Sequence, residues 1–99
     1  MPLTPDRKKQ YRTLGHNLKP VVTVAGNGLS ETVMGELNRA LDDHELIKVK
    51  LVIADRDLRK QVIAEMVKQS DSEIVQEIGK VALIYREAKK PNFKLSNVR

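Results

Sequence analysis

The fold of this chain is decided by the stretch Val21-Val22-Thr23-Val24-Ala25-Gly26-Asn27-Gly28-Leu29-Ser30-Glu31. A β-branched run, typical of a strand, ends at two glycines that flank an asparagine, and a serine suited to capping a helix follows. Glycine lets the backbone approach a ligand closely, and the first amides of a helix favour an anion. The stretch therefore predicts a strand, a phosphate-binding loop and a helix. The alternative is an ordinary Asn-Gly turn.

Composition indicates one domain with a basic surface. The 99 residues suffice for one modest core, and the absence of cysteine excludes a disulfide framework and a thiolate metal site. The apolar runs are too short to span a membrane, and the N-terminus lacks the apolar segment of a secretion signal. We therefore expect a cytoplasmic protein. The net charge of +5 favours an anionic partner, although many soluble domains are simply basic.

The positive charge is concentrated in three blocks. Residues 1–20 carry a net charge of +4, residues 48–69 carry +3 and residues 88–99 carry +4, while the segments between them are acidic. Blocks of this kind are often found where a protein contacts nucleic acid.

Hydrophobic periodicity predicts an α/β fold with the element order α-β-α-β-α-β-β. The strand–helix–strand unit from 21 to 53 is long enough for a right-handed parallel crossover, and the short turn at Gly79-Lys80 makes the last two strands an antiparallel hairpin. The result is a four-stranded mixed sheet with helices packed on it. Helices are expected at about residues 5–15, 31–43 and 57–69, and strands at 21–24, 46–53, 73–78 and 81–86.

The first predicted helix is apolar on one side and cationic on the other. Its apolar stripe is expected to consist of Arg7, through its aliphatic stem, and Tyr11, Leu14 and Leu18. The opposite side carries Lys8, Lys9, Arg12 and His16. This cationic side is either a solvated surface or a contact with RNA.

The first two predicted strands have different expected environments. The β-branched run 21–24 predicts a strand buried on both faces. In the strand 46–53, Lys48 and Lys50 project from the face opposite Ile47 and Val49. Because two lysines on one face are not expected in a core, part of this sheet should be open to solvent or to a polyanion.

The domain is expected to occupy residues 1–87. From Ala88 the chain is polar and basic, which predicts a flexible tail over 88–99. Phe93 in this tail could stack on a base or dock on the sheet, and both alternatives stay open.

No catalytic constellation is recognisable. His16 and His44 are far apart in sequence, Asp42 and Asp43 have no accompanying base or nucleophile, and the Asp-Arg-Asp run at 55–57 is better explained by helix capping than by a metal. We therefore expect no enzyme activity, no cofactor, no metal and no small-molecule substrate. With only three aromatic residues, an aromatic stacking platform for single strands is also disfavoured.

Five spaced motifs occur in one order along the chain: Leu18-Lys19-Pro20-Val21-Val22, Asn27-Gly28-Leu29-Ser30, His44-Glu45-Leu46-Ile47-Lys48-Val49-Lys50, Ile78-Gly79-Lys80 and Leu83-Ile84-Tyr85-Arg86. Together they resemble the CRM domain (chloroplast RNA splicing and ribosome maturation), in particular its stand-alone bacterial, YhbY-like form. The resemblance covers about residues 3–87.

The resemblance implies an RNA-binding module with a fold similar to the C-terminal domain of translation initiation factor three. It also implies association with precursors of the large ribosomal subunit. The family's Gly-x-x-Gly loop corresponds here to Ala25-Gly26-Asn27-Gly28, so the second glycine matches and the first is alanine. Lys48, Lys50 and Lys80 match family positions.

The sequence thus predicts a monomeric RNA-binding protein that acts in assembly of the large (50S) subunit and has no membrane partner. A DNA-binding or architectural protein and a protein-interaction module on the translation machinery are the alternatives. The expected RNA-binding residues are Ala25, Gly26, Asn27, Gly28, Leu29, Lys8, Lys9, Arg12, Lys19, Lys48, Lys50 and Lys80.

Overall fold

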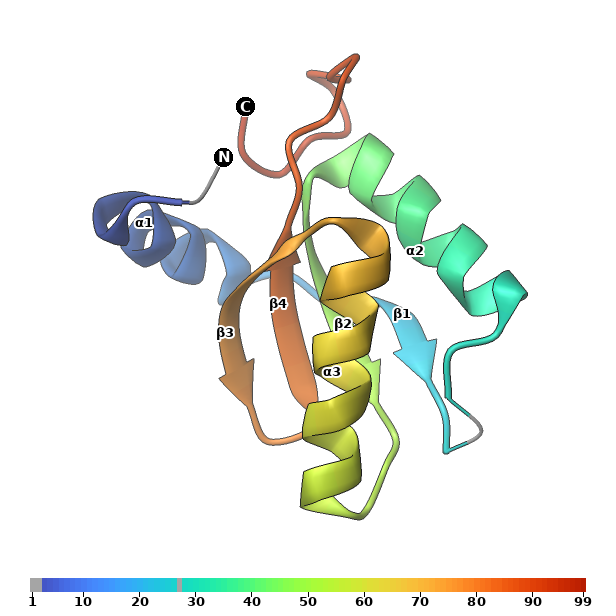
Figure 1. The fold of residues 1–99 in the computed structure, drawn as a ribbon. Coiled ribbons are helices and arrows are strands. Elements are labelled where there is room, and N and C mark those ends of the chain that lie inside the picture. The colour runs from blue at the N-terminus through green and yellow to red at the C-terminus, as the bar shows by residue number, and fades with distance from the viewer. Residues whose placement is uncertain (1–2, 27) are drawn as a thin grey trace.

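The computed structural model describes residues 3–26 and 28–99 and contains the predicted elements in the predicted order (Figure 1). The bounds differ from those expected by a few residues at most, and the largest difference is that the second strand ends earlier. The elements are α1 Pro5–Gly15, β1 Pro20–Val24, α2 Glu31–His44, β2 Leu46–Leu51, α3 Arg56–Ser70, β3 Glu73–Ile78 and β4 Val81–Tyr85.

The strands form one mixed sheet in the order β1-β2-β4-β3. β1 and β2 are parallel and are connected through α2, whereas β4 is antiparallel to both β2 and β3. This confirms the mixed four-stranded sheet, the parallel crossover and the hairpin. Both β1 and β3 are edge strands.

Side-chain caps begin all three helices. Thr4 Oγ1 accepts from the Arg7 amide at 3.2 Å, and Ser30 Oγ accepts from the Val33 amide at 3.1 Å. For α3 the sequence left Asp55 and Asp57 as candidates, and the structure selects Asp55, which accepts from two amides. The capping explanation of the Asp-Arg-Asp run is therefore confirmed.

The helices α2 and α3 cover one face of the sheet, where the main core lies (Figure 1). Leucines of α2 and the Ile63 and Met66 side chains of α3 pack against alternate residues of the strands. The fully or nearly fully buried members are Val22, Val24, Leu37, Leu41, Ile47, Val49, Leu51, Ile53, Ile63, Met66, Ala82 and Ile84.

The helix α1 covers only one end of the other face. Tyr11 packs on Tyr85, with ring centroids 4.9 Å apart, and Leu46, Val75 and Leu83 complete this smaller cluster. The rest of this face, which we call the open half-face, lies beyond α1. It consists of two rows of cross-strand partners. The first row, at the boundary with α1, contains Pro20, Lys48, Gln76 and Leu83, which is itself buried against α1, and the second contains Thr23, Lys50, Val81 and Ile78.

Two expectations about burial are wrong. The first strand is not buried on both faces: Val21 is 52% exposed and Thr23 is exposed, while Val22 and Val24 are buried. The reason is that β1 is an edge strand whose second face lies beyond the reach of α1. In a parallel strand at the edge, a β-branched run reflects strand propensity rather than two-sided burial.

The apolar stripe of α1 also differs from the expected one. Leu14 is 38% exposed and Arg7 is exposed, whereas Tyr11 and Gly15 are the buried residues of the helix. Gly15 faces the sheet, and its lack of a side chain lets the backbone of α1 approach β4 closely. The spacing of large apolar residues does not reveal such a contact, because glycine is not one of them.

Residues 88–99 contact the C-terminal end of α2. The Asn97 amide donates to the His44 carbonyl at 2.9 Å, and Asn97 Nδ2 donates to the Leu46 carbonyl at 2.7 Å. The buried Glu45 carboxylate accepts from the Ala88 amide, from Ser96 Oγ and from the Arg99 guanidinium. The flexibility of this segment and its separation from a domain of residues 1–87 stay predictions.

Candidate nucleic-acid interface

The glycine loop forms a tight turn after β1. The Gly28 amide donates to the Ala25 carbonyl at 2.9 Å, and Gly28 has a φ of 85°. Glycine adopts this left-handed conformation without the steric cost that a Cβ brings. The prediction for Asn27 lies outside the described residues.

The hydrogen bond of Gly28 corrects one part of the sequence interpretation. That interpretation took the loop amides as available to phosphate, but the amide of Gly28 is used to close the turn. Leu29 packs its side chain against the main core, so it anchors the loop. Of the loop positions that the structure describes, Ala25 and Gly26 are exposed, and a Cβ built on Gly26 would meet nothing within 4 Å.

Two predicted lysines lie at the same end of the sheet as this loop. The Leu51 amide donates to the Lys80 carbonyl at 2.7 Å, and the Val52 amide donates to the Val24 carbonyl at 2.8 Å. These bonds join the β3–β4 turn, the end of β2 and the end of β1. Lys50 and Lys80 are both exposed there.

Lys48 lies further along the same face, close to the end of α1. Its Nζ donates to the His16 carbonyl at 3.5 Å, and its side chain is half-buried. Helical spacing places Arg12 one turn before His16 on the same side of α1. Lys19 also lies near Lys48, because both line a shallow depression of about 200 Å³ in front of β1.

The remaining predicted cations lie on α1, away from the glycine loop (Figure 1). Lys9 is exposed and Lys8 is half-buried. The chain just before α1 is tied to the start of β3, since the Leu3 amide donates to Glu73 Oε2 at 2.8 Å. The structure thus brings Lys50, Lys80 and the loop together at one end, and places the cations of α1 toward the other.

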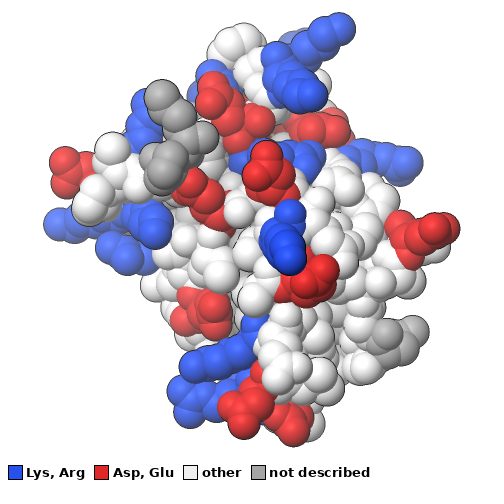
Figure 2. Space-filling view, in the orientation of Figure 1, with Lys and Arg blue, Asp and Glu red and all other residues white. Residues whose placement is uncertain are grey.

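The face on which α2 and α3 lie has mixed charge. Figure 2 shows acidic and basic side chains interspersed over these helices. Lysine and arginine side chains, in blue, gather mainly at the margins of this view. In contrast, the eight residues of the open half-face include two lysines and no acidic residue. Among the surfaces described, the open half-face is therefore the better match to a polyanion.

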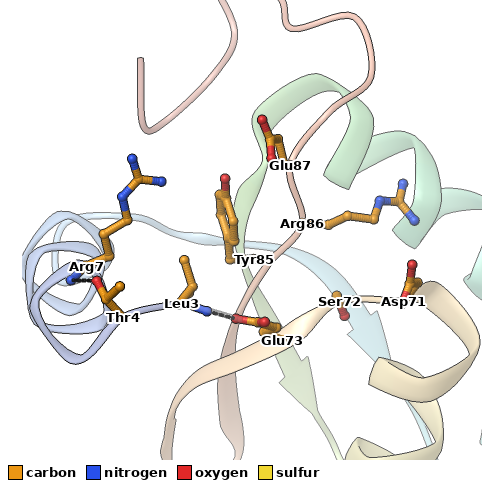
Figure 3. Close-up of a pocket in the computed structure, with 9 residues that line it drawn as sticks. All are labelled: Leu3, Thr4, Arg7, Asp71, Ser72, Glu73, Tyr85, Arg86 and Glu87. Carbon is orange, nitrogen blue, oxygen red and sulfur yellow. Dashed lines mark hydrogen bonds between the residues drawn. The ribbon is translucent and has the colours of Figure 1, made fainter. Parts of the chain in front are cut away.

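A cavity of about 430 Å³ separates α1 from the start of β3 and the end of β4 (Figure 3). Figure 3 shows the Tyr85 ring between Arg7 and Glu87, with Glu73 at the start of β3 and Asp71 just after α3. Burial raises the pKa of Tyr85 to about 12, so its hydroxyl is protonated at neutral pH. The mixture of acids and bases suits neither a polyanion nor a recognisable reaction.

Arg86 is a residue whose role the sequence interpretation missed. Its guanidinium donates to Asn38 Oδ1 and the Ser70 carbonyl, both at 2.8 Å, and to the Asn38 carbonyl and Asp42 Oδ1. It therefore joins the end of β4 to both helices of the main core. No sequence signal could identify this role, because it depends on how α2 and α3 are positioned.

Residues 3–26 and 28–99 contain no cluster of three or more histidine, cysteine or acidic side chains that could hold a metal ion. Within the same residues, each helix is too short or too polar to cross a membrane.

The chain is similar to proteins described as RNA-binding. It is 57% identical over 98 residues to a "Probable RNA-binding protein" of Pseudomonas aeruginosa, covering 99% of this chain and 94% of the relative. It is 39% identical over 93 residues to an "RNA-binding protein" of Haemophilus influenzae, covering 94% of each.

The fold also matches a solved structure. The solution structure of a hypothetical protein from Staphylococcus aureus superposes with a TM-score of 0.79 at 32% identity, covering 90% of this chain and 93% of that one. The model of the CRS1 / YhbY (CRM) domain matches residues 3–86, which include every element from α1 to β4. The chain therefore belongs to the CRS1/YhbY (CRM) domain family.

Proposed function

We propose that this protein binds RNA and acts in the cytoplasm as an assembly factor on precursor RNA of the large ribosomal subunit. The observation that carries the proposal is the open half-face, where Lys48 and Lys50 project without an acidic neighbour in either row. The RNA-binding descriptions of the relatives and the membership of the chain in the CRS1/YhbY (CRM) domain family support the RNA-binding part of the proposal.

The mechanism is recognition of the RNA backbone rather than a reaction. Lysines and exposed loop backbone contact phosphates, which determines the position of the protein on the RNA. Lys50, Lys80 and the loop at residues 25–28 form the first contact, and Lys48, Lys19 and Arg12 extend it toward α1. The protein holds one RNA conformation as a monomer and needs no cofactor.

A charge change at Gly26 tests the contribution of the loop. Gly26 is exposed, has space for a side chain and is outside the left-handed region, so Gly26→Asp adds a negative charge without backbone strain. Gly26→Asn is the matched neutral control. We expect Gly26→Asp to weaken binding of a labelled RNA hairpin several-fold and Gly26→Asn to have little effect, with unchanged melting temperatures. Equal affinities for the two folded variants would exclude the loop from the interface.

Salt dependence distinguishes a nucleic-acid partner from a protein partner. Each phosphate neutralised on duplex contributes a slope of about −0.9 in log affinity against log salt. We expect a steep slope for the parent, reduced by roughly one for each of Lys50→Gln and Lys80→Gln. A nearly flat dependence would favour a protein-interaction module. Competition between matched RNA and DNA duplexes addresses the DNA-binding alternative, since only RNA has the 2′-hydroxyl.

The ribosomal part of the proposal needs a test in cells. We expect ultraviolet cross-linking to recover the protein on large-subunit ribosomal RNA, with enrichment in precursor particles over mature subunits. Cross-links confined to other RNAs would leave RNA binding intact and contradict the assembly role.

A further inference from the structure

A shallow groove of about 210 Å³ lies on the open half-face, and its chemistry differs from that of a simple basic patch. The groove is bordered by the end of α1 and extends across β2, β4 and β3. It is lined by His16, Pro20, Lys48, Gln76, Ile78, Val81 and Leu83.

The floor of this groove is aliphatic and accessible. Ile78 is 64% exposed, which makes it the most exposed of the large apolar side chains in the strands. It lies opposite Val81, which is half-buried, and Leu83 forms the wall toward α1. Exposed aliphatic side chains in a strand have no role in binding phosphate, because phosphate gains nothing from apolar contact.

Cations lie next to the floor within the same two rows. Lys50 is the cross-strand partner of Val81, and Lys48 is the partner of Leu83. On the edge strand β3, Gln76 is the cross-strand partner of Leu83, and its side-chain amide can both donate and accept hydrogen bonds. Each row therefore contains a lysine on β2 and an aliphatic side chain on β4.

We propose that this groove binds one unpaired nucleotide of an RNA, with its base on Ile78 and Val81 beside the buried Leu83 and its phosphate at Lys48 and Lys50. A nucleotide is the ligand that has both an apolar base face and a phosphate a few ångströms away. Gln76 and His16 are positioned at the rim, where the hydrogen-bonding edge of a base lies. The groove is smaller than the roughly 300 to 1,000 Å³ of a site for a drug-sized ligand, which fits a single base.

This inference rests on the proposed RNA binding and adds a preference to it. Backbone contacts alone do not distinguish paired from unpaired RNA, whereas a base must leave the helix to reach the sheet. The proposal therefore requires the protein to prefer RNA with an unpaired nucleotide over a fully paired duplex of the same charge.

The test uses the full chain, Ile78→Ser, and Leu58→Ser as the matched control. Leu58 is 44% exposed on α3, which lies on the other face of the sheet. The probes are two labelled hairpins in which a non-nucleotide linker replaces the loop. They differ by one bulged nucleotide in the stem, so that one of them contains an unpaired nucleotide and the other is fully paired. We expect the parent to prefer the bulged hairpin, Ile78→Ser to lose about fivefold or more in affinity for that hairpin alone, and Leu58→Ser to match the parent. Melting temperatures confirm that both variants are folded.

A direct readout comes from carbon-13 labelled methyl groups. Ring currents of a bound base should shift the methyl resonances of Ile78, Val81 and Leu83 when the bulged hairpin is added, and the fully paired hairpin should leave them nearly unchanged. Methyl shifts on adding ribosomal protein but not RNA would assign the groove to a protein partner and overturn the proposal.

The outcomes separate this inference from the proposed function. If Gly26→Asp weakens both hairpins but Ile78→Ser changes neither, RNA binding stands and the groove is excluded. If Ile78→Ser weakens both hairpins equally, the face contacts RNA without reading a base, which also overturns the inference. If the parent binds neither hairpin at low salt, both proposals fail.

Discussion

Gly15 of α1 lies directly against Leu83 of β4: a Cβ built on the glycine would clash with Leu83 Cδ2 and would stand 3.2 Å from Leu83 Cγ. This contact sets how closely α1 approaches the sheet. The next residue, His16, already lines the open groove. The boundary between the covered and the open parts of this face therefore depends on a residue without a side chain.

The two helical glycines should respond oppositely to alanine. In Gly15→Ala the added methyl must displace the buried Leu83, and such overpacking costs about 1–3 kcal/mol, more than the gain in helix propensity of up to about 1 kcal/mol. In α2, Gly35 has open space around a Cβ, so Gly35→Ala should stabilise the protein by roughly 0.5–1 kcal/mol. Urea denaturation measures both. Stabilisation by both substitutions would contradict the close packing of α1.

Arg86 should be replaceable by lysine only at a substantial cost. Its guanidinium makes four hydrogen bonds to residues of α2 and α3, and a lysine cannot reproduce this planar geometry. We expect Arg86→Lys to lower the free energy of unfolding by about 1.5–3 kcal/mol. Arg56→Lys, at an exposed position at the start of α3, should change it by less than about 0.5 kcal/mol. Similar stabilities of the two variants in thermal denaturation would show that the Arg86 contacts contribute little.

Glu45 should make the protein sensitive to acid. The hydrogen bond from Arg99 holds the pKa of this buried carboxylate below its ordinary value of 4.5, against the opposing effect of burial. A group with a lowered folded pKa contributes stability that is present above about pH 4.5 and is lost as the pH falls through the folded pKa. Glu45→Gln should therefore be less stable at neutral pH and should lose less stability on acidification.

The control for this experiment is Glu87→Gln. Glu87 also lies near Arg99, at 3.8 Å, but its side chain is 71% exposed, so an exposed pair of this kind should contribute little. Stability curves for Glu45→Gln and Glu87→Gln that coincide with each other across acidic pH would show that residues 88–99 do not hold this carboxylate in solution.

Tyr85 should titrate late in alkaline solution. Its pKa is raised to about 12, chiefly by burial, and its ring packs on Tyr11. The chain has two tyrosines and no tryptophan, so in Tyr11→Phe the phenolate absorbance reports Tyr85 alone. Because the folded pKa is raised, burial of Tyr85 contributes stability that is fully present below about pH 10 and is lost as the pH rises toward 12. Titration near pH 10 while circular dichroism still shows a folded protein would contradict this burial.

Local patterns were sufficient for the secondary structure and for much of the fold. The strands, the capped helices and the short turn at Gly79 are each determined by residues close in sequence, and the structure confirms them. The alternation of Lys48 and Lys50 with apolar residues correctly predicted that part of one sheet face is open.

Other features depended on contacts between distant residues. The exposure of Val21 follows from the edge position of β1, and the buried side of α1 follows from the contact between Gly15 and Leu83. The hydrogen bond between Gly28 and Ala25 removes an amide that the glycine pattern left available. The groove at Ile78 joins residues from three strands and the end of α1, so no single segment contains its signal.

The sequence by itself determined which segments form helices and strands and where the lysines of β2 point, because these depend on backbone propensity and on a side-chain period of two. Only the tertiary structure decided which half of the second sheet face α1 covers and which residues become neighbours in the half it leaves open. The physical reason is that strand order and helix docking are selected by packing between residues far apart in the chain, and the same local pattern is compatible with several such arrangements.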